Sequence, residues 1–362
     1  SAVAVAKKLK IPVCEIKIKN NHPTGFFDLF NKENNFNEPN ENDEALVLHT
    51  SGTTSRPKIV PLTNKNIYSS SLNISKSLSL SEKDHCLNIM PLFHIHGLIA
   101  IIASSMKSGA SVCASSGFNA LKFLELAKSE KITWYSGVPT MHQTIMLRAE
   151  KNLELAKNLN LRLVRSSSAS LPPAVFEKLN KVFNCPVIEA YGMTEATHQM
   201  TSNPLPPKKQ KAGFVGIPAG PEVCIMNDNY QIMKSGDIGE VCIKGSNVTS
   251  GYENNPEANE SSFSNGWFRT GDQGFFDQDG YLKISGRLKE IINKGGEKIS
   301  PLEIDNVLMD HPSIEQAVCF GYEDKMLGED IATAIIVKEG MNFTEEDLKN
   351  YANEKLAKFK VP

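Results

Sequence analysis

The hydrophobic pattern divides the chain into stretches of different periodicity. Within residues 45–205, apolar runs of strand length, such as 132–138 and 161–166, alternate with segments of helical spacing, such as 119–128. A threonine also opens a helical pattern over 63–77, where its hydroxyl is suited to cap the first turn. Strands that alternate with helices predict α/β layers built around largely parallel sheets.

Beyond about residue 205, glycine and proline separate short strands, which predicts a β-rich subdomain. The expected strands are 221–226, 239–245 and 280–285. The expected elements after Gly286–Arg287 are a helix over 301–311, strands over 313–321 and 330–339, and a helix from Thr344 to about Lys358. We therefore expect a large α/β domain of several subdomains over residues 1–286 and a small α+β domain over 287–362.

A polar, asparagine-rich segment over 31–44 is typical of a linker or an exposed loop. The chain has 362 residues, 40% of them hydrophobic and 22% charged, which is ordinary for a soluble globular protein of two or three domains. The net charge of -2 argues against a nucleic-acid-binding protein that relies on overall positive charge. The longest purely apolar run, 98–103, is far shorter than the roughly 20 residues of a membrane-spanning helix.

The cysteines are scattered, and several lie in predicted strands. This pattern is typical of reduced core thiols in a cytosolic compartment rather than of disulfides or metal ligands. They are Cys14, Cys86, Cys113, Cys185, Cys224, Cys242 and Cys319. We expect a cytoplasmic protein, with a peroxisomal location as the alternative if a C-terminal signal follows.

A hydroxyl-rich turn followed by a lysine is the strongest chemical signal. It lies in LHTSGTTSRPKIVPLTN, residues 48–64, and consists of Thr50, Ser51, Gly52, Thr53, Thr54 and Lys58. Small residues let backbone amides approach a polyphosphate, and a lysine adds positive charge. The Walker A spacing and the glycine motifs of dinucleotide-binding and hydrolase folds are absent from the sequence. The alternative is a solvated Ser/Thr loop.

A second signal, EAYGMTEATHQM at residues 189–200, follows a predicted buried strand. A carboxylate next to a hydroxyl, here Glu195 next to Thr194, suits a hydrated Mg²⁺ that bridges phosphates. The alternative is a helix N-terminus that Thr194 caps.

A third signal spans residues 267–301. Asp272 follows a Thr-Gly turn, where a lone carboxylate is able to accept two hydrogen bonds from ribose hydroxyls. Arg287 and Lys289 add positive charge near phosphate or ribose. The alternative for these two cations is surface ion pairing, which contributes little stability.

In this order, the three motifs resemble the adenylate-forming superfamily of acyl-CoA synthetases, luciferases and peptide-synthetase adenylation domains, over essentially the whole chain. The resemblance implies the adenylate-forming fold and a two-step reaction. A carboxylate attacks the α-phosphate of ATP, pyrophosphate leaves, and the thiol of coenzyme A captures the acyl-adenylate. ATP, Mg²⁺ and coenzyme A are the implied cofactors. The protein's task in such chemistry is mainly to position anions and neutralise charge.

The resemblance also implies roles for individual residues. For the nucleotide they are Thr50–Thr54 and Lys58 at the phosphates, Tyr191 near adenine, Ser167, Ser168, Ala169, Glu189, Ala190 and Gly192 along the adenine pocket, Thr194 at the α-phosphate, Glu195 at Mg²⁺, and Asp272 with Arg287 at the ribose. Lys289 matches the hinge about which the small domain rotates, and Gly295–Gly296–Glu297 match the loop that guides the coenzyme A arm.

Compared with the family pattern, the chain is expected to be incomplete at both ends. A large N-terminal portion of the usual big domain is absent. The end at Lys358–Pro362 falls just before the stretch that carries the family's catalytic lysine, and neither Lys358 nor Lys360 matches that position. The full reaction is therefore not assigned to these residues alone.

Three polar features narrow the choice of carboxylic acid. They are His94 and His96 in MPLFHIHGL, the serines of residues 165–173, and His198 directly after the Mg²⁺ motif. If His94, Ser168 and His198 converge, the acyl pocket is polar. A small diacid satisfies its donors, whereas an apolar tail leaves each donor unpaired at roughly 1–3 kcal/mol. The alternative for His94 is aromatic packing at the acyl tunnel, and His96 is assigned to the core or the surface.

The combination of TEATHQM with SNPLPPKKQKAGFVGIPAG resembles the oxalate–CoA ligase branch of the superfamily. Oxalate is therefore the expected acid, and 4-coumarate or a short- or medium-chain acid is the alternative. A catalytically silent nucleotide-binding module and a stand-alone adenylation domain that loads a carrier-protein thiol are two further alternatives. Oxalate-dependent formation of AMP and a thioester distinguishes the first interpretation from the others.

Overall fold

The computed structural model describes residues 2–11, 13, 16–18, 27–29, 38–50 and 57–362. The chain divides into two units, residues 1–40 and 41–362. The elements of the first unit are helix α1 (Ala2–Lys8) and the antiparallel strands β1 (Ile16–Ile18) and β2 (Phe27–Leu29). Half of the segment predicted as a linker, residues 31–37, lies outside the described residues, and residues 38–43 have exposed side chains.

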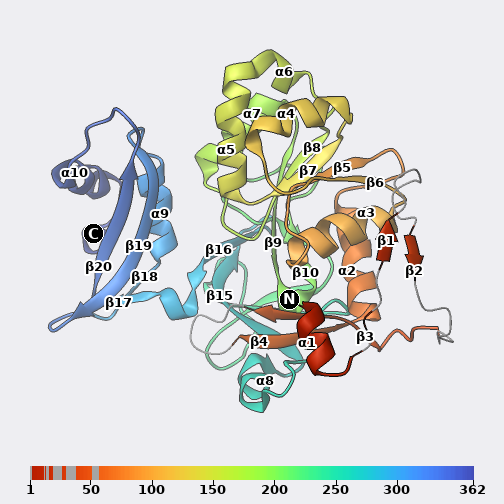
Figure 1. The fold of residues 1–362 in the computed structure, drawn as a ribbon. Coiled ribbons are helices and arrows are strands. Elements are labelled where there is room, and N and C mark those ends of the chain that lie inside the picture. Colours follow the sequence, from red (N-terminus) through yellow and green to blue (C-terminus); the bar gives the residue numbers. More distant parts are fainter. Residues whose placement is uncertain (1, 12, 14–15, 19–26, 30–37, 51–56) are drawn as a thin grey trace. The chain divides into compact units, whose positions relative to one another are not determined.

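A seven-stranded sheet, with the order β11-β10-β9-β8-β7-β5-β6, forms the centre of the second unit (Figure 1). Its strands are β5 (His85–Asn88), β6 (Ser111–Ala114), β7 (Trp134–Gly137), β8 (Leu163–Ser166), β9 (Val187–Met193), β10 (His198–Ser202) and β11 (Ile217–Pro218). The strands from β6 to β9 are parallel to their neighbours, whereas β10 and β11 pair antiparallel. The prediction of α/β layers around a largely parallel sheet is confirmed.

Helices cover both faces of this sheet (Figure 1). The first face carries α4 (Ala120–Ser129), α5 (Pro139–Ala149), the 3₁₀ turn η2 (Glu150–Asn152), α6 (Leu153–Lys157) and α7 (Pro173–Phe183). The second face carries α2 (Asn64–Ser77), the π-helix η1 (His96–Ala103) and α3 (Ser104–Lys107). Neighbouring strand residues such as Leu163 and Val164 are both fully buried, yet they belong to different apolar clusters, because successive side chains point to opposite faces.

Local signals in the sequence set the starts of these helices. The Thr63 hydroxyl accepts a hydrogen bond from the backbone N–H of Asn66, so the predicted cap of α2 is confirmed. Asn119 caps α4 in the same way. α5 and α7 both begin at a proline, which lacks the N–H that the first turn leaves without a helical partner.

The predicted β-rich subdomain is an antiparallel sheet beside the large one. Its strands are β12 (Glu222–Met226), β13 (Gly239–Lys244), β14 (Phe263–Ser264), β15 (Trp267–Phe276) and β16 (Leu282–Arg287), with helix α8 (Pro256–Ser262) before β14. A separate antiparallel pair, β3 (Glu44–Thr50) and β4 (Lys58–Thr63), flanks the hydroxyl-rich turn. The described cysteines are all free thiols, and all except Cys113 are buried; Cys14 lies outside the described residues.

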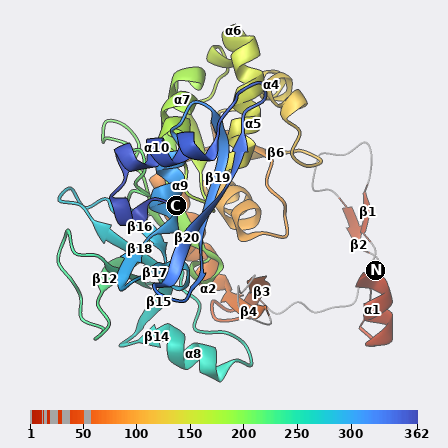
Figure 2. The same ribbon diagram turned by 90° about the vertical axis from the view of Figure 1, so that its left-hand side faces the viewer.

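The last part of the chain has its own small sheet and apolar core, which includes Ile304, Leu308 and Leu348. Its elements are η4 (Leu288–Glu290), β17 (Ile292–Lys294), β18 (Glu297–Ile299), α9 (Pro301–Met309), β19 (Ile314–Asp324), β20 (Gly328–Val337), α10 (Glu345–Lys355) and η5 (Lys358–Lys360). The long strands β19 and β20 run side by side along most of this part (Figure 2). The division into domains at residue 287 stays a prediction.

No helix in the described part of the chain is both long and apolar enough to cross a membrane.

Candidate active site

A cavity of about 610 Å³ brings together residues that are far apart in the sequence. From the predicted set it is lined by Ser168, Ala169, Glu189, Ala190, Tyr191, Gly192, Asp272 and Arg287. Residues after Arg287, including Pro301, Asp305 and Phe320, also line the cavity. Ser167 is fully buried, and its hydroxyl donates to the Ala190 carbonyl over 2.8 Å. The adenine and ribose residues proposed from the sequence therefore share one cavity.

Asp272 contacts two other residues of the predicted site, Arg287 and Tyr191. It lies directly opposite Arg287 in the register of β15 and β16, and its Oδ1 lies 2.9 Å from Arg287 Nε. The Tyr191 hydroxyl, at the end of β9, donates a hydrogen bond to Asp272 Oδ2. Burial raises the pKa of Asp272, while Arg287 and the tyrosine hydroxyl oppose that shift. A carboxylate with two polar partners thus faces the cavity.

Gly192 follows Tyr191 and tolerates no side chain. A Cβ at this position would lie 1.9 Å from the carbonyl oxygen of His198 on the neighbouring strand β10. In the register of the two strands, Gly192 lies opposite Gln199, and Met193 lies opposite His198. Glycine is required here because of backbone proximity.

Two of the predicted phosphate residues, Thr50 and Lys58, lie opposite each other at the end of β3 and the start of β4. Lys58 pairs with Thr50 in the β3–β4 register, and its Nζ lies 4.4 Å from the centre of the Tyr252 ring. The Tyr252 hydroxyl donates to Glu195 Oε1 over 2.8 Å. Tyr252, which the sequence analysis did not single out, therefore connects the lysine to the buried carboxylate. Ser51, Gly52, Thr53 and Thr54 lie outside the described residues.

Thr194 opens the three-residue 3₁₀ turn η3 (Thr194–Ala196), in which Met193 is the N-cap residue and no side chain caps the turn. The alternative in which Thr194 caps a helix is therefore wrong. Lys289 lies in η4, between β16 and β17. Gly295 and Gly296 form the β17–β18 turn with φ of 59° and 92°, values that favour glycine. The roles of these residues remain predictions.

A buried polar cluster adjoins the cavity through Ser168, and it contains the two histidines His96 and His198. His96 Nδ1 lies 3.0 Å from Ser168 Oγ, and its ring centre lies 5.0 Å from that of His198. His94 is exposed, and its Nδ1 accepts the backbone N–H of His96. The convergence of His94 with Ser168 and His198 stays a prediction, whereas His96, which the sequence analysis assigned to the core or the surface, is buried and lies next to both.

The inward position of His96 results from an unpredicted π-helix that begins at this residue. At its first turn a Cβ on Gly97 would lie 2.4 Å from the Pro91 carbonyl oxygen, so only glycine allows the loop to fold back here. π-Helical turns are rare and frequently occur at functional sites. This turn directs His96 inward, where it is fully buried. Burial, together with the charge of Arg165, holds the pKa of His96 well below its usual value.

Arg165 and Ser136 complete the cluster, and sequence reasoning assigned a role to neither. Arg165 Nη1 lies 3.3 Å from Ser136 Oγ, and His96 Nε2 lies 2.6 Å from the same oxygen. A charged residue within the apolar strand pattern LRLVRS was the available signal, since an arginine is almost never buried without a reason.

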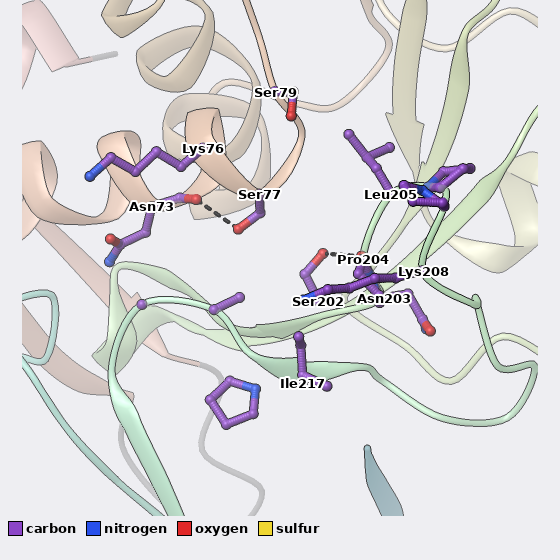
Figure 3. Close-up of a pocket in the computed structure, with 15 residues that line it drawn as sticks. Asn73, Lys76, Ser77, Ser79, Ser202, Asn203, Pro204, Leu205, Lys208 and Ile217 are labelled. Atoms are coloured by element: carbon purple, nitrogen blue, oxygen red, sulfur yellow. Dashed lines mark hydrogen bonds between the residues drawn. The ribbon is translucent and has the colours of Figure 1, made fainter. Parts of the chain in front are cut away.

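A second cavity, of about 580 Å³, lies between the end of α2 and the segment around β11 (Figure 3). Its lining includes Lys76, Ser77 and Lys208 but no residue of the predicted site. Gln199 Nε2 donates to Ser77 Oγ over 3.0 Å, so the second cavity lies next to the polar cluster through Gln199.

Glu189 gives a test of this site by protein stability. Its Oε1 accepts the Leu171 N–H, its Oε2 has no partner among the described residues, and burial raises its pKa to about 8. The folded protein therefore keeps this proton between about pH 4.5 and 8, where the unfolded chain has lost it, and stability falls as the pH rises through this window. We expect Glu189→Gln to stabilise the fold at pH 8 by at least about 1 kcal/mol, and to have little effect near pH 4.

Thermal unfolding at the two pH values measures this difference, and Glu177→Gln, at an exposed position of α7, is the matched control. Equal effects of Glu189→Gln at pH 4 and pH 8 would contradict the assignment of a protonated, buried carboxyl.

Comparison with known protein families gives two matches. Residues 3–253 match the family model described as AMP-binding enzyme, and residues 303–362 match that of the AMP-binding enzyme C-terminal domain.

Among curated proteins, the chain is 51% identical over 323 residues to an oxalate–CoA ligase of Arabidopsis thaliana, covering 88% of this chain and 63% of that protein. It is 48% identical over 322 residues to an oxalate–CoA ligase of Saccharomyces cerevisiae, covering 88% and 59%. The chain thus spans about three fifths of the length of these relatives.

Among solved structures, ATP-bound MatB from Rhodopseudomonas palustris superposes with a TM-score of 0.84 at 30% identity, over 89% of this chain and 64% of that one. The O-succinylbenzoate coenzyme A synthetase MenE from Bacillus subtilis, in complex with ATP and magnesium ion, gives 0.81 at 32% identity, over 90% and 66%. The adenylate-forming fold expected from the motifs is confirmed.

Proposed function

Because the chain belongs to the family of AMP-binding enzymes, we propose that it carries the nucleotide and acid sites of an ATP-dependent acid–CoA ligase that activates oxalate. The observation that carries this proposal is the shared cavity. Three stretches of sequence, around residues 168, 191 and 272, supply one space of about 610 Å³, within the usual size range of small-molecule sites.

The cavity residues fit a nucleoside. Asp272 is a buried carboxylate whose two oxygens already bind an O–H and an N–H group, and ribose hydroxyls offer the same kind of donor. Tyr191, on β9, also lines the cavity and offers a ring against which a base packs. Arg287, which is half exposed, adds positive charge beside the sugar.

The phosphates belong, in this proposal, beside Tyr252, which contacts Lys58 through its ring and Glu195 through its hydroxyl. Lys58 contributes a positive charge to the phosphates, and Thr194 a hydroxyl donor to the α-phosphate. Glu195 is a suitable Mg²⁺ ligand because one of its oxygens is held by Tyr252 while the residue stays buried. When bound, Mg²⁺ neutralises charge on the phosphates.

The reaction that follows has two steps. A carboxylate oxygen of the acid attacks the α-phosphorus of ATP, and the bond to pyrophosphate breaks. The thiol sulfur of coenzyme A then attacks the acyl carbon, and AMP leaves with the thiol proton lost to solvent. Lys289 is proposed as the hinge between the steps, since η4 connects the core of the large α/β part to that of the last part.

Oxalate is the proposed acid because the cluster next to the cavity is polar and basic. His96, Ser136, His198 and Arg165 are all buried behind Ser168. An apolar tail against this cluster would leave buried donors unpaired, whereas a second carboxylate accepts hydrogen bonds from them. The names of the two oxalate–CoA ligase relatives support the same choice.

Calorimetric titration of this chain tests the proposal. We expect AMP to bind, and oxalate to bind in the presence of an unreactive ATP analogue with Mg²⁺, while hexanoate and 4-coumarate do not. Binding of 4-coumarate without oxalate would instead support an aryl-acid ligase. Failure of AMP to bind would contradict the nucleotide site itself.

A further inference from the structure

Arg165 is a buried cation without a counter-charge. It lies in the middle of β8 with no exposed surface. Its Nη1 lies 3.3 Å from Ser136 Oγ, and its Nη2 lies 3.3 Å from Gln199 Oε1 and 3.5 Å from His198 Nδ1. All three partners are neutral acceptors. Within the described residues Arg165 forms no ion pair, and its Nε has no hydrogen-bond partner.

The burial of a cation without a counter-charge is energetically costly. Removing a charge from water costs several kcal/mol unless an opposite charge or a full set of hydrogen bonds replaces the water. Burial lowers the pKa of Arg165 to about 9, so the guanidinium still carries its proton at neutral pH. An anionic ligand next to the cluster would supply the missing opposite charge.

The donor and acceptor roles within the cluster follow from one end of the hydrogen-bond chain, at Arg165, to the other, at Ser168. Arginine has no acceptor atom, so Ser136 Oγ accepts from Arg165. The Ser136 hydroxyl then donates a hydrogen bond to His96 Nε2, because the described residues offer it no other acceptor. His96 consequently carries its proton on Nδ1 and donates to Ser168 Oγ. The Ser168 hydroxyl is left with a proton to donate, and Ser168 is exposed and lines the cavity.

We infer that Arg165 positions this relay, Ser136 to His96 to Ser168, so that Ser168 donates a hydrogen bond to the distal carboxylate of a dicarboxylic acid, while the guanidinium balances that carboxylate's charge. This inference rests on the proposed function and assigns its specificity to a residue behind the pocket. Arg165 is thus a positioning residue, because it acts through Ser136 and His96.

The inference predicts selectivity by charge. Oxamate has the size and shape of oxalate but carries a neutral amide in place of one carboxylate. The chain, loaded with an unreactive ATP analogue and Mg²⁺, is expected to bind oxalate at least about tenfold more tightly than oxamate. In Arg165→Met this ratio is expected to fall to nearly one, whereas Arg165→Lys, which keeps a positive donor, is expected to recover part of it.

Ser136→Ala distinguishes the effect of the hydrogen-bond relay from that of the guanidinium charge. It keeps Arg165 but removes the hydroxyl that connects Arg165 to His96. It is expected to weaken oxalate binding without removing the preference over oxamate entirely. In the Ser136→Ala/Ser168→Ala double variant the losses are expected to be less than additive, since both substitutions interrupt one chain of hydrogen bonds. Fully additive losses would overturn the relay.

AMP binding, measured in every variant, distinguishes a failure of the proposed function from a failure of the role proposed for Arg165. Loss of AMP binding in the unsubstituted chain would contradict the proposed function. Retained AMP binding with an unchanged oxalate-to-oxamate ratio in Arg165→Met would overturn only the role of Arg165. If Arg165→Met does not fold, the ratio in the unsubstituted chain still decides, because equal binding of oxalate and oxamate contradicts a counter-charge.

Discussion

Replacing Asp272 with alanine is expected to weaken AMP binding by roughly 100-fold. In the proposed site both oxygens of this carboxylate face ribose hydroxyls, and hydrogen bonds to a charged group contribute roughly 1.5–3 kcal/mol each. About 1.4 kcal/mol corresponds to a tenfold change in affinity, so the loss of two such bonds reaches this size. The fold is expected to remain intact, because Arg287 is half exposed and rehydrates.

Calorimetric titration with AMP measures this loss of affinity. One further variant is expected to give an intermediate loss, and a second serves as a control. Asp272→Asn keeps one oxygen acceptor and is expected to lose an intermediate amount. Asp279→Ala removes an exposed carboxylate that pairs with Lys211 and does not line the cavity, so it serves as the matched control. A loss of less than threefold in Asp272→Ala would show that the sugar binds elsewhere.

Replacing Lys58 with alanine is expected to weaken binding of an unreactive ATP analogue with Mg²⁺ by roughly 10- to 100-fold, and binding of AMP by less than threefold. The difference arises because a lysine at the β- and γ-phosphates has no partner in AMP. The Lys58 ammonium lies against the Tyr252 ring, so its position is fixed before a ligand arrives.

Two variants control the second experiment. Lys65→Ala removes an exposed lysine that pairs with Glu41 near the start of α2, and it is expected to change neither affinity. Tyr252→Phe keeps the ring beside Lys58 but removes the hydrogen bond to Glu195. It is expected to raise the Mg²⁺ concentration required for binding of the ATP analogue. Equal losses for AMP and the ATP analogue in Lys58→Ala would mean that the lysine supports the fold instead of the phosphates.

Much of the fold follows from signals that lie within a few residues of each other. Thr63 before α2 acts locally, so the sequence alone predicted this helix start, and the prolines that open α5 and α7 are local signals of the same kind. The convergence of residues near 168, 191 and 272 was expected only through the resemblance to a family. The hydrophobic periodicity of single segments does not predict the order of the strands in the sheet.

The polar cluster shows where local reasoning stops. His94 and His96 are separated by one residue, and only the π-helix decides which of them turns inward. Arg165 has the neighbours of a core strand, and its partners Ser136 and His198 come from β7 and β10. Contacts between side chains of different strands depend on tertiary packing, for which one sequence without relatives carries no pairwise signal.

Both oxygens of the Asp272 carboxylate have partners within the protein, the Tyr191 hydroxyl and the Arg287 guanidinium. In the proposed site, the hydroxyls of an incoming sugar must therefore replace the hydrogen bonds that Asp272 accepts from Tyr191 and Arg287. A ribonucleotide returns two hydroxyls for the bonds it displaces, whereas a deoxyribonucleotide returns one. Discrimination against the precursors of DNA would then be a by-product of how the aspartate is held, without any group that repels them.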